Sequence, residues 1–217
     1  MKHIYIIAEI GCNHCGDFEL AKRMVDEAKA CGVDAVKFQT FKAAELISRY
    51  APKADYQKVT TGNEENQLEM TRKLELPYDE FIKLRDYAIS LGLDTFSTPF
   101  DMDSIDFLEK KGQVIWKIPS GEVTNLPFLE RIAKFKITGK KIILSTGMCT
   151  VEEIHQAVDI ICKYEKPENL IILHCNTEYP TPDKDVNLSA IDTLHKEFPG
   201  IAVSYTHLRA HETKANL

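Results

Sequence analysis

The chain has 217 residues, a length that allows one sizeable hydrophobic core. Its net charge of −6 argues against a main role on nucleic acid or a membrane surface, because both need a basic face. No apolar run reaches the roughly 18 residues of a membrane span. We therefore expect a cytoplasmic protein of ordinary globular composition that has neither nucleic acid nor membrane as its partner.

Short runs rich in β-branched residues recur along the chain. They predict strands at 4–10, 33–39, 93–97, 114–118, 141–145, 170–174 and 201–203. The stretches between them have helical period. In the first, Leu20, Met24, Ala28 and Cys31 form one face of a helix that Asp17 is suited to cap. The long irregular insertion 42–70 follows the second run, and its polar part 60–67 suggests a loop over the mouth of the fold.

Strands that alternate with helices form parallel sheets joined by right-handed crossovers. An open doubly wound sheet and a closed barrel both satisfy this rule. Six to seven strands in one unbroken alternation favour an α/β fold of TIM type, a (β/α)8 barrel that is incomplete in this chain. No G-x-G-x-x-G follows any run, so a dinucleotide-binding sheet has no support. We assign the barrel to residues 1–203.

Polar side chains stand at the carboxyl ends of most of these runs. In a barrel of parallel strands, this end faces the active-site mouth. Lysines, carboxylates and hydroxyls in equivalent positions favour a site for an anionic substrate such as a phosphate or a carboxylate. The candidate residues are Glu9, Lys37, Gln39, Thr98, Lys117, Ser120, Glu122, Ser145, Asn176, Thr177 and Tyr179.

The two lysines leave other functions open. A Schiff-base aldolase with Lys117 or Lys37 as the nucleophile fits the same pattern. A barrel that binds phosphorylated ligands without turning them over fits it as well. Trapping of a carbonyl ligand on either lysine by borohydride would support the first alternative, and tight binding of a phosphorylated ligand without phosphate release would support the second.

Six segments resemble, in order, the motifs of the N-acetylneuraminate (sialic acid) synthases. They are 8–16 (AEIGCNHCG), 36–40 (VKFQT), 97–101 (STPFD), 116–122 (WKIPSGE), 143–148 (ILSTGM) and 174–182 (HCNTEYPTP). The order and spacing of the motifs fit from residue 4 to about residue 202. The resemblance implies a transferase of bacterial type that condenses phosphoenolpyruvate with N-acetylmannosamine to give N-acetylneuraminate and phosphate. Related synthases that make legionaminate, pseudaminate or spore-coat sugars are the nearest alternatives.

The resemblance also implies roles for the polar residues at the strand ends. Glu9, Lys37 and Lys117 would be catalytic, with Glu9 close to the reacting carbons. The groups that hold phosphoenolpyruvate would be Lys37, Thr98, Lys117, Ser120 and Ser145. The groups that contact the amino sugar would be Gln39, Glu122 and Tyr179, and either Asn176 or Thr177 would face the ligand.

The family's remaining motifs do not follow residue 203. The resemblance implies Mn²⁺ or Mg²⁺ bound by histidines of a G-[YFL]-S-D-H-[TS] and an E-[KR]-H-F motif, and a homodimer formed through a C-terminal domain. Residues 204–217 contain neither motif and no strand-like pattern, so we interpret them as a non-native tail. We expect no metal ligand in this chain, with His207 as a weak exception, and we expect the 217-residue chain by itself to be inactive.

Overall fold

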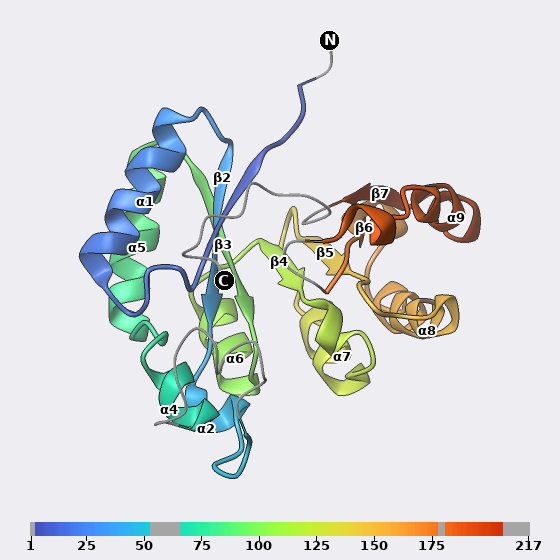
Figure 1. The fold of residues 1–217 in the computed structure, drawn as a ribbon. Helices are drawn as coiled ribbons and strands as arrows, with labels where there is room; N and C mark the ends of the chain where they lie inside the picture. The colour runs from blue at the N-terminus through green and yellow to red at the C-terminus, as the bar shows by residue number, and fades with distance from the viewer. Residues whose placement is uncertain (1–2, 53–65, 178–180, 206–217) are drawn as a thin grey trace. The chain divides into compact units, whose positions relative to one another are not determined.

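The computed structural model describes residues 3–52, 66–177 and 181–205 (Figure 1). The chain divides into two compact units, Met1–Lys111 and Gly112–Leu217, and each is described by itself. Within the described ranges, no helix is long and apolar enough to cross a membrane.

The first unit contains a parallel sheet of three strands in the order β1-β2-β3. Helices α1 and α5 lie together along this sheet (Figure 1). In chain order its elements are β1 (Ile7–Gly11), α1 (Phe18–Ala30), β2 (Ala35–Thr40), α2 (Ala43–Leu46), α4 (Gln67–Arg72), α5 (Tyr78–Ser90), β3 (Asp94–Pro99) and α6 (Met102–Lys110).

The second unit contains a parallel sheet of four strands in the order β4-β5-β6-β7. Its elements are β4 (Ile115–Ile118), η1 (Ser120–Glu122), α7 (Leu126–Ala133), β5 (Lys141–Ser145), α8 (Val151–Cys162), η2 (Pro167–Asn169), β6 (Leu170–His174), η3 (Asp183–Asp185), α9 (Ser189–Glu197) and β7 (Ala202–Tyr205).

Side-chain caps fix where several helices begin, because the first backbone N–H groups of a helix have no partner inside it. As predicted, the Asp17 side chain caps α1 by accepting from the Leu20 backbone N–H. Thr150 and Glu153 form a reciprocal capping box at the start of α8. Asp101 caps α6 and also accepts from the Lys42 backbone N–H, so it ties the end of β2 to the helix after β3.

Large apolar side chains fill the core of each unit. In the first, the rings of Phe38 and Phe81 meet edge to face with centroids 5.9 Å apart, and Leu84 is fully buried. In the second, Trp116 and Leu129 are fully buried. Burying each such side chain stabilises the fold by about 1.5–3 kcal/mol, which holds the strands in place under the polar strand ends.

The predicted α/β fold with parallel strands is confirmed, and every predicted run overlaps with an observed strand. The described strands form two sheets, so the barrel is not closed. The first strand begins at Ile7 rather than at Ile4, because its partner β2 begins at Ala35, which pairs with Ile7. The last strand continues beyond residue 203, because Ser204 and Tyr205 pair with β6, and here the predicted end is wrong.

Three further predictions concern α1, the insertion and the tail. The helix predicted after Asp17 is confirmed as α1, and of its predicted face Ala28 is buried, whereas Leu20 and Met24 are partly exposed and the helix also buries Ala21 and Val25. Residues 53–65 lie outside the described ranges, and with them most of the predicted loop. The boundary at residue 203 stays a prediction, since 206–217, His207 included, lie outside the described ranges as well.

Candidate functional site

Strand register places four of the predicted site residues on one face of the first sheet. Glu9 pairs with Lys37, and Gln39 pairs with Thr98. Side chains two residues apart on a strand share a face, and directly paired residues share it too. Glu9, Lys37, Gln39 and Thr98 therefore lie on the same face near the carboxyl ends of their strands, as the sequence predicted.

Lys37 is the centre of this group. Its Nζ atom lies 2.6 Å from Glu9 Oε2 and donates to Thr98 Oγ1 at 3.1 Å. The side chains of Lys37 and Glu9 are only 10% and 25% exposed. An ammonium group has three N–H donors, so two contacts leave one for a ligand. The second oxygen of Glu9, Oε1, is buried and has no hydrogen-bond partner among the residues that the structure describes.

Gly11 makes room for the polar groups around it. The register of β1 shifts between Glu9 and Gly11, and Gly11 has φ of 57°. A Cβ atom at Gly11 would lie 2.9 Å from Glu9 Oε1 and 3.4 Å from Gln39 Nε2. Glycine is therefore required on two grounds, its left-handed backbone and the close approach of these side chains.

The loop after β1 adds two titratable side chains. Burial raises the pKa of the Cys12 thiol, and the nearby Glu9 carboxylate raises it further. Burial lowers the pKa of His14, whose Nδ1 atom accepts from the Gly16 backbone N–H at 3.0 Å. A thiol with a raised pKa is a poor nucleophile and a poor metal ligand.

The second unit places Lys117 and Ser145 on one face of its sheet. Lys117 on β4 pairs with Ile143 on β5, and Ser145 follows Ile143 two residues later on β5, so its side chain shares the same face. Both are buried, at 8% and 5% exposure. The Lys117 Nζ atom donates to the backbone oxygen of Ile118 at 3.0 Å, which keeps the ammonium group at the end of β4.

The turns after β4, β5 and β6 meet around Ser120. Its Oγ atom accepts from the Gly147 backbone N–H at 2.8 Å and lies 3.5 Å from Cys175 Sγ. A Cβ atom on Gly147 would lie 3.1 Å from Cγ2 of Thr177. The structure thus brings Ser120 and Thr177 to the same turn. The sequence pattern did not assign a role to Cys175.

Glu122 has a partner that the sequence analysis missed. Its Oε2 atom accepts from Asn125 Nδ2 at 2.6 Å, and Asn125 Oδ1 accepts from the Phe128 backbone N–H. Asn125 is the N-cap of α7. The signal was present in the sequence, since Asn two residues before Pro127 is typical of a helix start.

The segment after β6 is held by backbone contacts. His174 Nε2 lies 2.9 Å from the Val186 oxygen, and Asn176 Nδ2 donates to the Asp185 oxygen at 3.3 Å. Tyr179 lies outside the described residues. The two groups of predicted residues belong to different units, so their convergence on one ligand stays a prediction.

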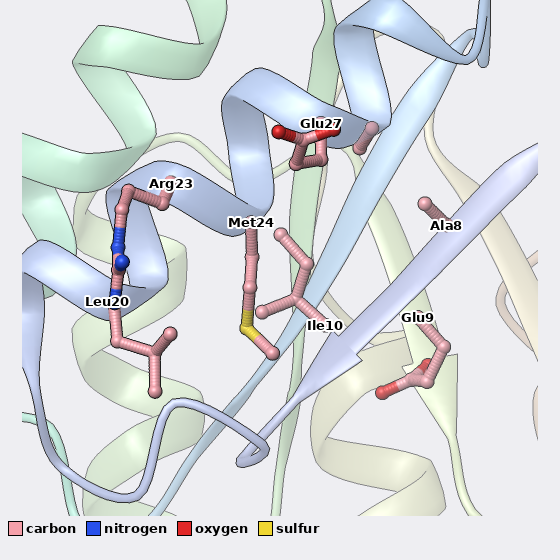
Figure 2. Close-up of a pocket in the computed structure, with 8 residues that line it drawn as sticks. Ala8, Glu9, Ile10, Leu20, Arg23, Met24 and Glu27 are labelled. Atoms are coloured by element: carbon pink, nitrogen blue, oxygen red, sulfur yellow. The ribbon is translucent and has the colours of Figure 1, made fainter. Parts of the chain in front are cut away.

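A pocket of about 460 Å³ lies between β1 and α1 (Figure 2). Its lining residues are Ala8, Glu9, Ile10, Leu20, Arg23, Met24, Glu27 and Ala28. In Figure 2 the side chains of Ile10 and Met24 lie close together, whereas the Glu9 carboxylate points away from the helix. The Glu9 carboxylate therefore lies on the other face of β1 from most of this pocket.

No metal ligand is expected from the sequence in this chain apart from His207, which lies outside the described residues. Over residues 3–52, 66–177 and 181–205, no group of three or more His, Cys, Asp or Glu side chains comes together in a way that could bind an ion.

Parallel strands with buried lysines and hydroxyls at their carboxyl ends define an α/β protein of TIM-barrel type. The match to a family model makes the assignment specific. Residues 24–214 match the model of the NeuB family, and the chain belongs to this family.

Individual relatives agree with this assignment. The chain is 49% identical over 199 residues to the N,N'-diacetyllegionaminic acid synthase of Campylobacter jejuni, covering 91% of this chain and 59% of the relative. Among solved structures, the chain resembles the crystal structure of the N-acetylneuraminic acid (sialic acid) synthetase from Leptospira borgpetersenii in complex with citrate. The two structures match with a TM-score of 0.77 and the sequences are 33% identical, over 93% of this chain and 64% of the other.

A more distant likeness concerns the fold alone. The truncated 3-deoxy-D-arabino-heptulosonate 7-phosphate synthase from Thermotoga maritima matches with a TM-score of 0.63 at 14% identity, over 93% of this chain and 63% of the other. This likeness supports the TIM-type architecture. The chain spans about three fifths of the length of these relatives.

Proposed function

We propose that this chain carries the phosphoenolpyruvate site of a synthase that joins phosphoenolpyruvate to an N-acetylated amino sugar. The enol carbon of phosphoenolpyruvate attacks the aldehyde carbon of the open-chain sugar and forms a C–C bond. Water adds to the carbon that carried the phosphate ester, and phosphate leaves by C–O cleavage. The products are a 2-oxo acid sugar and inorganic phosphate.

The observation that carries the proposal is the contact of Lys37 with Glu9 and Thr98 in a family of synthases. A buried ammonium group with one N–H left for a ligand suits a carboxylate or phosphate oxygen. Lys117 and Ser145 supply the same kinds of donor from the second sheet. Glu9 Oε1, buried without a partner, is the group that we assign to proton transfer at the reacting carbons.

Two amino sugars are candidates for the acceptor. The sequence motifs resemble the N-acetylneuraminate branch, which favours N-acetylmannosamine. The 49% identity to a diacetyllegionaminic acid synthase favours a diacetylated hexose, since the sialic acid synthetase from Leptospira is 33% identical. In either case Gln39, Glu122 and Tyr179 are the sugar contacts, together with Asn176 or Thr177.

Titration calorimetry with phosphoenolpyruvate tests the donor site, because every residue expected to hold this ligand lies in the chain. We expect Lys37→Met and Lys117→Met each to weaken binding by about 10- to 100-fold, the worth of a charge-assisted hydrogen bond. Lys42→Met is the matched control, since Lys42 also follows β2 but pairs with Asp103 in solvent. No binding by the wild-type chain, or equal effects of Lys37→Met and Lys42→Met, would contradict the proposal.

Turnover and adduct trapping separate the remaining alternatives. Phosphate release after each candidate sugar is added, with Mn²⁺ or Mg²⁺ present, identifies the acceptor. Full turnover would contradict our expectation that the 217-residue chain is inactive. A pyruvate adduct on Lys117 or Lys37 after borohydride reduction would favour a Schiff-base aldolase instead. The metal and the homodimer remain expectations from the family resemblance, and the cytoplasmic location remains an expectation from the sequence.

A further inference from the structure

Ser120 is held in place by a neighbouring turn rather than by its own strand. It is the first residue of η1, directly after β4, and its Oγ atom accepts from the Gly147 backbone N–H at 2.8 Å. Gly147 is buried and lies two residues beyond the end of β5. The position of the hydroxyl therefore depends on a backbone group of another βα unit.

The hydrogen-bond inventory of a hydroxyl gives this contact a direction. A serine hydroxyl has one O–H donor and two acceptor lone pairs. Because a backbone N–H can only donate, the contact with Gly147 occupies a lone pair and leaves the Ser120 hydrogen for another partner. The atom within reach is Cys175 Sγ at 3.5 Å, and sulfur is a weak acceptor. An anionic oxygen would take the hydrogen from sulfur at little cost.

We propose that Gly147 is a positioning residue that makes Ser120 a hydrogen-bond donor to an anionic oxygen of phosphoenolpyruvate. This inference rests on the proposed function and adds a residue to its donor site. Gly147 acts through Ser120: the Gly147 backbone N–H holds the Ser120 Oγ atom in place, and the Ser120 hydroxyl hydrogen therefore points away from the turn after β5. Cys175 holds that hydrogen when no ligand is bound.

The space around Gly147 explains why the residue has no side chain. A Cβ atom there would lie 3.1 Å from Ser120 Oγ, 3.1 Å from Thr177 Cγ2 and 3.3 Å from the Cys175 oxygen. Contacts this short force the neighbours to move by a few tenths of an ångström. Gly147→Ala should therefore displace the Ser120 hydroxyl, the nearest polar side-chain atom, while the backbone conformation remains one that alanine can adopt.

A double-mutant cycle on phosphoenolpyruvate affinity tests the proposal with the 217-residue chain. The variants are Ser120→Ala, Gly147→Ala and the double variant, measured by titration calorimetry. We expect each single variant to bind about tenfold more weakly and the double variant to be within about twofold of Ser120→Ala, because both changes remove the same hydrogen bond. Gly121→Ala is the matched control, since a Cβ atom there meets nothing within 4 Å.

The outcomes separate this inference from the proposed function. Two outcomes would overturn the positioning role and leave the proposed function standing. In the first, the loss of phosphoenolpyruvate affinity in the double variant equals the product of the losses in the two single variants. In the second, Gly147→Ala binds phosphoenolpyruvate as tightly as the wild type. A wild-type chain that does not bind phosphoenolpyruvate would overturn both.

A second measurement applies if Gly147→Ala does not fold. In the wild-type chain the Gly147 amide proton resonance should move on addition of phosphoenolpyruvate, because the ligand polarises the hydroxyl that this N–H contacts. In Ser120→Ala the resonance should not respond. Equal responses in the two proteins would overturn the inference.

Discussion

Replacing Lys37 by Met should destabilise the first unit far more than replacing both members of its ion pair. The Nζ and Oε2 atoms are 2.6 Å apart. At an effective dielectric constant of about 20, the gross attraction at this distance is about 6 kcal/mol. Desolvation offsets part of it, because the two side chains are only 10% and 25% exposed. A single replacement leaves the Glu9 carboxylate largely buried and without its cation.

We expect Lys37→Met to lower the free energy of unfolding by about 3 kcal/mol, and the Lys37→Met/Glu9→Gln double variant to lower it by about 1 kcal/mol. Urea unfolding with hydrogen exchange of the β2 amides follows the first unit. The fluorescence of Trp116, the single tryptophan, follows the second unit and serves as an internal reference. The four proteins of the cycle give the coupling energy directly.

The exposed Lys42–Asp103 pair is a control of the same length. Its Nζ and Oδ2 atoms are also 2.6 Å apart, but the side chains are 42% and 64% exposed. Solvent screens such a pair, so its coupling should be too small to measure. If the Glu9–Lys37 cycle gave a coupling no larger than that of this control, the argument that burial gives the pair its strength would be refuted.

Three more predictions concern stability. Gly16→Ala should destabilise the protein by about 2–3 kcal/mol, because the φ of Gly16 is 75° and a Cβ atom there would lie 2.6 Å from a backbone oxygen. Gly32→Ala is the control and should cost about 1 kcal/mol, because Gly32 has φ of 77° but a Cβ atom there meets nothing within 4 Å. The urea midpoints of the two variants test the difference. Lys140→Met should cost about 3–5 kcal/mol in the same assay, because a buried ammonium group that binds three backbone oxygens is lost, whereas exposed Lys166→Met should change little. Burial lowers the pKa of His14 in the folded protein, so as the pH falls the unfolded chain binds the His14 proton at a higher pH than the folded protein does. The free energy of unfolding should therefore decrease as the pH drops through 6.5. A series of urea midpoints measured against pH should show this dependence in the wild type and not in His14→Phe.

The limits of strands could be predicted where a strand has neighbours on both sides and consists mainly of apolar residues. The runs at 141–145 and 170–174 match β5 and β6 residue for residue, because both strands are central and consist mainly of apolar residues. β1 is an edge strand with one partner, and the length of that partner sets where it begins. A sequence run shows which residues favour extension, but it does not show where a neighbouring strand ends.

The buried face of α1 was missed for a different reason. The large residues Leu20 and Met24 suggested the inward face, but the helix buries Ala21, Val25 and Ala28. Small side chains allow a helix to approach its neighbours closely, so the largest hydrophobic side chains do not always mark the buried face. Leu20 and Met24 instead line the pocket beside β1 (Figure 2).

The candidate site could be predicted where strand register determines it. Glu9, Lys37 and Thr98 follow from the twofold alternation of side chains, and the structure places them in contact. The contact between Ser120 and Gly147 could not be predicted, because it depends on how two turns fold against each other. Asn125 could have been found from its capping position before α7.

The same division separates the two substrates of the proposed reaction. Most of the groups assigned to phosphoenolpyruvate stand on strands, as Lys37, Thr98, Lys117 and Ser145 do, where paired neighbours fix their positions. Of the groups assigned to the sugar, Glu122 and Asn176 stand in segments after strands and are held by local contacts. A change in such a segment alters the sugar site without disturbing the sheets. A family that keeps one donor and varies its acceptor is expected to place its substitutions there.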